Sequence, residues 1–82
     1  MVAFPSSALA ATINWDGSNS GNWDTGANWD TNAVPTGTGN VFIDDVTVNT
    51  PVVGTGVTAN ADSLYVGDTG AGALTISGTG AL

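Results

Sequence analysis

The chain lacks every cationic side chain. Its 82 residues include no Lys, Arg or His, and its seven acidic residues are all Asp, which sets the formal charge at −7. Affinity for nucleic acid rests mainly on cations that neutralise phosphates, and attachment to anionic lipid needs clusters of Lys or Arg. No apolar run approaches the ~20 residues of a membrane-spanning helix. The sequence therefore excludes nucleic acid as a partner and predicts no direct membrane insertion of this segment.

Most catalytic groups are also missing. Ser/His/Asp and Cys/His sites need an imidazole, Ser/Lys sites need an amine, and phosphoryl transfer needs a Lys or Arg clamp. The adjacent Asp44 and Asp45 would point to opposite faces of a strand, so they cannot act as a pair. With no Cys in the chain, no disulfide can staple the fold. We expect no enzymatic activity, no catalytic residue and no cofactor.

What is present favours an all-β protein. Charged residues make up only 9% of the chain, apolar residues 41%, and the mean hydropathy is +0.18, whereas disordered chains are less hydrophobic and more charged. Alternation of apolar and polar residues, broken by Gly, Asn and Asp, predicts strands. The predicted strands cover residues 40–43, 46–49, 63–66 and 73–77.

The composition divides the chain into three parts. Residues 1–10 end in the small-x-small triplet Ala8-Leu9-Ala10, which has the form of a signal-peptidase cleavage site and indicates the remnant of a secretion signal. Residues 11–35 form a cap rich in Trp, Asn and Gly. Residues 36–82 are predicted to be the first repeats of a β-solenoid, truncated within a repeat.

Three tryptophans lie in a repeated Asn-Trp-Asp triplet, at residues 14–16, 22–24 and 28–30. One interpretation makes Trp15, Trp23 and Trp29 large apolar groups that close the open end of the solenoid, since a terminal repeat must be capped. The alternative makes the same three residues an exposed carbohydrate-binding site that stacks on sugar rings.

The solenoid prediction comes from a repeated pattern near the C-terminus. The tetrapeptides at 64–67 and 74–77 each place two large apolar residues two apart, and each is followed by a Gly-rich link. The repeated unit is about ten residues, and stacked coils of roughly 20 residues would fill one interior column. A small β-sandwich uses similar strands and is the alternative fold.

A calcium site was weighed against a simpler role. Residues 16–21 match the opening of an EF-hand-type loop, but the twelfth position, where a bidentate Glu belongs, is Ala27. We therefore assign no metal site and expect Asp and Asn here to serve as turn residues.

Together these segments resemble the N-terminal part of secreted bacterial β-solenoid proteins with autotransporter-associated β-strand repeats. Similar segments occur in PEP-CTERM-type exported proteins. The resemblance is carried by the Trp-rich opening, by Val34-Pro35, by the strand at 40–44 and by the repeat at 64–78. It implies a right-handed parallel β-helix passenger on the outside of a Gram-negative-type bacterium, extracellular or at the outer-membrane surface.

The main prediction is thus a non-enzymatic structural or adhesive passenger segment, with surface glycans or self-association through stacked β-coils as its interactions. A carbohydrate-binding β module that uses the three tryptophans is the first alternative. The leader of a polysaccharide-active β-helix enzyme is the second.

Overall fold

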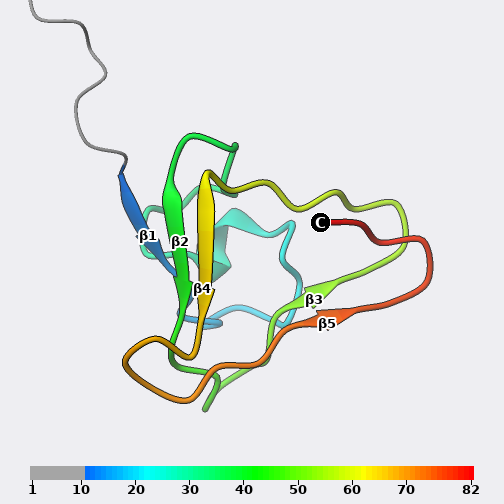
Figure 1. The fold of residues 1–82 in the computed structure, drawn as a ribbon. Helices are drawn as coiled ribbons and strands as arrows, with labels where there is room; N and C mark the ends of the chain where they lie inside the picture. The colour runs from blue at the N-terminus through cyan, green and yellow to red at the C-terminus, as the bar shows by residue number, and fades with distance from the viewer. Residues whose placement is uncertain (1–10) are drawn as a thin grey trace, which may run out of the picture.

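The computed structural model describes residues 11–82, and the predicted signal remnant at 1–10 lies outside the described residues. The described chain is all-β, as expected: it contains five short strands, one 3-10 turn and no α-helix (Figure 1). Nothing in residues 11–82 forms a helix long and apolar enough to cross a membrane. The strands are β1 (Thr12–Asn14), β2 (Asn40–Ile43), β3 (Val52–Val53), β4 (Ser63–Val66) and β5 (Thr75–Ile76), and the 3-10 turn is η1 (Gly26–Asn28).

The strands form two sheets in which every strand pair is parallel. One sheet has the order β1-β2-β4, and the other pairs β3 with β5. Figure 1 shows the first sheet on one side of the molecule and the β3–β5 pair on the other. Parallel pairing throughout differs from the antiparallel sheets of a β-sandwich, the alternative fold.

The register repeats at a constant interval. Asn40 of β2 pairs with Ser63 of β4, Val52 of β3 pairs with Thr75 of β5, and an isolated parallel bridge joins Thr58 to Ala81. The differences 63 − 40, 75 − 52 and 81 − 58 are each 23. Three separate parts of the chain therefore lie directly against the segment 23 residues earlier.

Two of the predicted strands, 40–43 and 63–66, are confirmed with the bounds given. The strand predicted at 46–49 is wrong. Asp45 accepts hydrogen bonds from the backbone N–H of Thr47 at 3.0 Å and from its hydroxyl at 2.6 Å, which closes a turn there and leaves Val48 66% exposed. The strand forms six residues later, at Val52–Val53.

The last predicted strand is shorter than expected, covering Thr75–Ile76 rather than 73–77. The ten-residue repeat does not set the stacking either. Leu64 lies against Val41, and Thr75 lies against Val52, so the two similar tetrapeptides belong to different sheets. Local similarity pointed to the right residue types but to the wrong partners.

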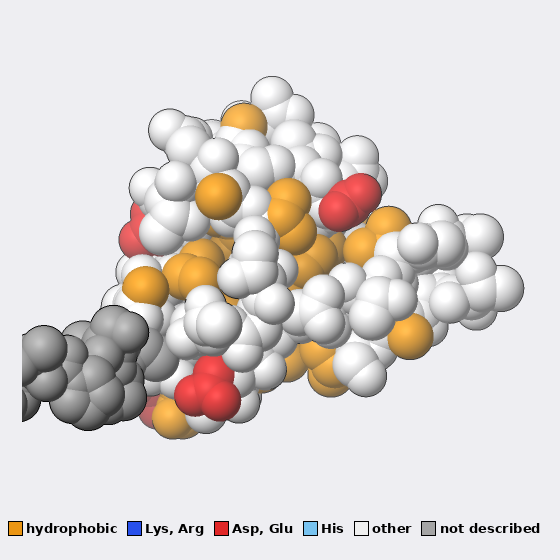
Figure 2. Space-filling view, turned by 90° about the horizontal axis from the view of Figure 1, so that it is seen from above, with side chains coloured by type: hydrophobic (Ala, Val, Ile, Leu, Met, Phe, Trp, Pro, Cys, Tyr) orange, Lys and Arg blue, Asp and Glu red, His pale blue; other side chains and the backbone are white. Residues whose placement is uncertain are grey.

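The core lies between the two sheets and the Trp-rich segment. Its buried members are Ile13, Trp15, Trp23, Trp29, Val41, Ile43, Val53 and Ala59. Within β2, Val41 and Ile43 point inward, as the two-residue period of a strand requires. Figure 2 shows hydrophobic side chains gathered in the middle of one face, surrounded by polar surface.

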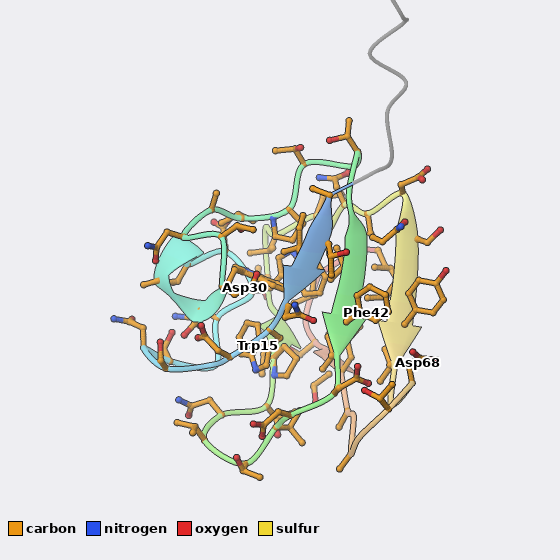
Figure 3. All side chains as sticks on the ribbon, turned by 90° about the vertical axis from the view of Figure 1, so that its left-hand side faces the viewer. Trp15, Asp30, Phe42 and Asp68 are labelled. Carbon is orange, nitrogen blue, oxygen red and sulfur yellow. The ribbon has the colours of Figure 1, made fainter. Side chains whose placement is uncertain are left out.

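Phe42 of β2 points to the outside of the first sheet. It stacks on Tyr65 of β4 with ring centroids 4.7 Å apart and planes within 9° of parallel (Figure 3). The two rings occupy paired positions in neighbouring strands, so this contact is a direct consequence of the register.

Candidate functional site

The three Asn-Trp-Asp triplets converge, and their indoles form one cluster. Trp15, Trp23 and Trp29 are 3%, 0% and 1% exposed. Trp29 lies at the centre, edge-on to Trp15 at 5.0 Å and to Trp23 at 4.7 Å between ring centroids. Stacking on a sugar requires an open ring face, and none of the three offers one. This burial argues against the exposed carbohydrate platform and fits the capping interpretation.

The three indole N–H groups have different surroundings. Trp15 Nε1 donates to the backbone carbonyl of Asn49 at 2.8 Å, and Trp29 Nε1 donates to the carbonyl of Trp23 at 2.9 Å. Trp23 Nε1 is buried and has no acceptor among the described residues. An unpartnered buried donor costs about 1–3 kcal/mol, so such a group calls for an explanation.

Asn28 holds the loop around this cluster. Its side chain is fully buried, and all four of its hydrogen-bonding positions are used. Oδ1 accepts from the backbone N–H groups of Asn19 and Ser20 at 2.9 and 2.7 Å, while Nδ2 donates to the hydroxyl of Ser20 at 3.0 Å and to the carbonyl of Asn22 at 2.9 Å. The amide thus replaces the water that these turn groups would otherwise bind.

The Asp residues of the triplets have separate roles. Asp30 accepts from the backbone N–H and from Nδ2 of Asn14, both at 2.9 Å, and so ties the Trp segment to β1. Asp16 accepts from the N–H of Ser18 at 3.0 Å, the Asx-turn expected of a turn residue. Within residues 11–82 no three His, Cys, Asp or Glu side chains gather into a group that could hold a metal ion.

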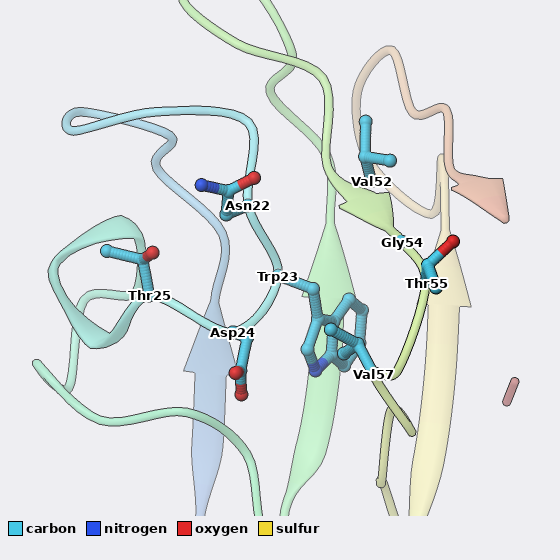
Figure 4. Close-up of a pocket in the computed structure, with 8 residues that line it drawn as sticks. All are labelled: Asn22, Trp23, Asp24, Thr25, Val52, Gly54, Thr55 and Val57. Atoms are coloured by element: carbon cyan, nitrogen blue, oxygen red, sulfur yellow. The ribbon is translucent and has the colours of Figure 1, made fainter. Parts of the chain in front are cut away.

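A cavity of about 400 Å³ opens beside the cluster. One wall comes from the turn at residues 22–25, and the other comes from β3 and the loop that follows it. The two walls meet because the N–H of Trp23 donates to the carbonyl of Val52 at 3.1 Å, and the N–H of Val52 donates to the carbonyl of Gly21 at 2.7 Å. The lining residues, drawn in Figure 4, are Asn22, Trp23, Asp24, Thr25, Val52, Gly54, Thr55 and Val57.

The family model described as "Domain of unknown function (DUF8693)" matches residues 14–82, which is most of the chain. The chain belongs to this family. No curated protein and no solved structure matches it.

The DUF8693 match contains all three triplets and the whole cavity lining. Sequence reasoning identified Trp23 but missed the opposite wall, because Val52, Thr55 and Val57 lie about thirty residues further along the chain. The available signal was Pro51-Val52-Val53-Gly54, a short β-branched run bounded by Pro and Gly, which is typical of a strand.

A second carboxylate of this DUF8693 chain links neighbouring layers. Asp44 Oδ1 accepts from the backbone N–H groups of Asp68 and Thr69 at 2.6 and 3.1 Å, and Oδ2 accepts from the Thr69 hydroxyl at 3.1 Å. Desolvation raises the pKa of Asp44, but the hydrogen bonds from Thr69 and Asp68 together outweigh it and hold the pKa below the ordinary 3.8. This carboxylate therefore serves to bind a turn.

Proposed function

We propose that this chain is a non-enzymatic structural element, built as a stack of β-coils and closed at one end by the tryptophan cluster. In this proposal it forms the beginning of a parallel β-helix of the right-handed type that the sequence resemblance implies. The observation that carries the proposal is the constant 23-residue interval at three separate places in the chain. Stacked coils of equal length are the defining property of a solenoid.

Side-chain contacts between layers support the same arrangement. Phe42 stacks on Tyr65, which lies 23 residues later, and Thr55 accepts from the N–H of Thr79, 24 residues later, at 3.4 Å. The Asp44 carboxylate reaches Asp68 over the same interval of 24 residues. Like side-chain ladders in a solenoid, these contacts join equivalent positions of successive coils.

The cap interpretation rests on the edge of β1. Trp15 and Trp29 form an antiparallel bridge, and the N–H of Asp30 donates to the carbonyl of Asn14 at 2.9 Å. The Trp segment therefore runs along β1 on the side away from β2, against the direction of the stack. A terminal repeat needs such a cover, because an unpaired strand edge recruits other strands.

The use of the carboxylates favours a structural role over a catalytic one. Asp16, Asp30, Asp44 and Asp45 each accept hydrogen bonds from backbone N–H groups. Carboxylates held in this way stay ionised and organise turns. Display outside the cell is part of the proposal and rests on the sequence resemblance and on the cation-free, anionic composition.

Duplicating residues 40–62 directly after residue 62 tests the stack. The variant adds one 23-residue coil, so we expect cooperative urea unfolding at a midpoint no lower than that of the parent chain, and a molecule longer by ~4.8 Å in solution scattering. The matched control duplicates residues 40–61 and adds 22 residues. That one-residue slip turns inward side chains outward, and the midpoint should fall. Equal stability of the two variants would contradict the proposal.

The location is tested separately. Antibody against the full chain should label intact cells of the producing bacterium as strongly as permeabilised ones. Labelling that appears only after permeabilisation would overturn the surface assignment while leaving the β-stack intact.

A further inference from the structure

The buried Trp23 indole lines the cavity and lacks an acceptor. The side chain is 0% exposed, and Nε1 has no hydrogen-bond partner among the described residues. The equivalent atoms of Trp15 and Trp29 are both satisfied, at 2.8 and 2.9 Å. The missing partner must therefore come from the cavity, as a water or as an oxygen atom of a ligand.

One wall of the cavity carries polar side chains that the fold does not use. Within residues 11–82, the side chains of Asn22, Asp24 and Thr25 make no hydrogen bond to other residues. They supply an amide, a carboxylate and a hydroxyl beside the Trp23 indole (Figure 4). The turn at 22–25 is held by other groups, including the N–H of Thr25, which donates to the carbonyl of Asn22 at 3.2 Å.

The opposite wall is mixed. Val52 and Val57 present methyl groups, and the hydroxyl of Thr55 lies at the margin (Figure 4). A cavity of about 400 Å³ falls within the ~300–1,000 Å³ of small-molecule sites. The site thus joins an apolar surface to hydrogen-bonding groups of both kinds.

The charges narrow the class of ligand. An anion has no cation to bind anywhere in the chain and would lie beside Asp24. A divalent cation would find one carboxylate in the lining, fewer than such ions require. A purely apolar ligand would leave Trp23 Nε1 unpartnered. A neutral polyhydroxylated molecule satisfies all three conditions, because its C–H face suits the valines and its hydroxyls both accept and donate.

We propose that this cavity binds a neutral saccharide unit, with one hydroxyl or acetamido oxygen accepting from Trp23 Nε1 and another hydroxyl donating to Asp24. The mode differs from ring stacking, since Trp23 contributes its N–H and not its face. The proposal goes beyond the structural role and does not depend on it.

The test follows the indole N–H resonances of the ¹⁵N-labelled full chain during titration with glucose, galactose, mannose and N-acetylglucosamine. The chain has three tryptophans and therefore three such signals. We expect at least one sugar to move the Trp23 signal downfield in a saturable way, with a millimolar dissociation constant, while the signals of Trp15 and Trp29 stay in place. Inorganic phosphate should move none of them.

Three variants accompany the titration. Trp23→Phe keeps the ring but removes the donor and should abolish binding. Asp24→Asn, at an exposed position, should weaken binding about tenfold through loss of one charge-assisted hydrogen bond. Asp45→Asn, whose carboxylate is outside the cavity lining, is the matched control and should bind normally.

Some results would overturn the proposal. One is that no sugar moves the Trp23 signal, with Nε1–H showing only a cross-peak to water, which would assign the cavity to solvent. Another is a sugar response unchanged in Asp24→Asn and in Thr55→Val. These two rim variants decide the question if Trp23→Phe does not fold.

Discussion

The indole N–H of Trp29 donates to the backbone carbonyl of Trp23 over 2.9 Å, while the rings of the same two residues meet edge-on with centroids 4.7 Å apart. Two of the repeated triplets are therefore joined both by packing and by a hydrogen bond. Trp29 also contacts Trp15, so all three repeats depend on this one side chain.

Replacing Trp29 should severely destabilise the chain. Trp29→Ala removes the central ring of the cluster and should lower the free energy of unfolding by about 3–5 kcal/mol in urea titration. Tyr65→Ala is the matched control, because Tyr65 is 41% exposed and its stacking on Phe42 contributes about 0.5–1.5 kcal/mol. Similar losses for the two variants would show that the Trp cluster is not the centre of the core. If Trp29→Ala does not fold, Trp29→Phe gives the smaller loss expected from the missing N–H and ring.

Asn28→Asp should destabilise the loop in a pH-dependent way. The new carboxylate still accepts from Asn19 and Ser20, but it cannot donate to the carbonyl of Asn22, and it places a charge at a fully buried position. We expect a loss of about 1–3 kcal/mol at neutral pH. The loss should shrink in acid, where the protonated group donates again. Asn19→Asp, at an exposed side chain, is the control and should change the urea midpoint little at any pH.

The Asp44 contacts predict acid sensitivity. Because the pKa of Asp44 is lower in the folded chain than the ordinary 3.8, its ionised form contributes stability above that pH. This contribution should be lost as the pH falls below 3.8 and through the lowered pKa. Urea midpoints measured across this range should decrease for the parent chain and decrease less for Asp44→Ala.

Hydrogen exchange distinguishes this link between layers from a local turn. In Asp44→Ala the amides of Asp68 and Thr69 should lose protection, since they donate to that carboxylate. In Asp45→Ala they should keep it, because Asp45 bonds only to Thr47 within its own turn. Loss of protection in both variants would contradict a specific role for Asp44.

Two glycines offer a matched test of layer packing. A Cβ at Gly72 would collide with the N atom of Gly67 and the carbonyl of Ile43, both backbone atoms that cannot move aside. Gly72→Ala should therefore cost about 1–3 kcal/mol. Gly54→Ala, where nothing lies within 4 Å of the added atom, should be neutral or slightly stabilising. Equal thermal midpoints for the two variants would show that residues 67–72 do not pack on β2 as described.

Local pattern was sufficient for some elements. The alternation of small or polar with apolar residues at 40–43 and 63–66 predicted both strands with the bounds observed, because inward and outward positions simply alternate there. At 46–49 the same alternation was misleading. The Asp45 carboxylate captures the N–H of Thr47, and a local hydrogen bond of this kind outcompetes pairing with a distant strand.

By itself the sequence determined the charge, the exclusion of nucleic acid, the all-β class and the residues rich enough in apolar surface to build a core. These follow from composition and from short-range periodicity. Only the tertiary structure decided that the interval between layers is 23 residues, that the three indoles are buried, and that the turn at 22–25 meets the loop after β3. The reason is physical: register and cavities depend on contacts between residues far apart in the chain, and no local pattern specifies which distant partner a segment will meet.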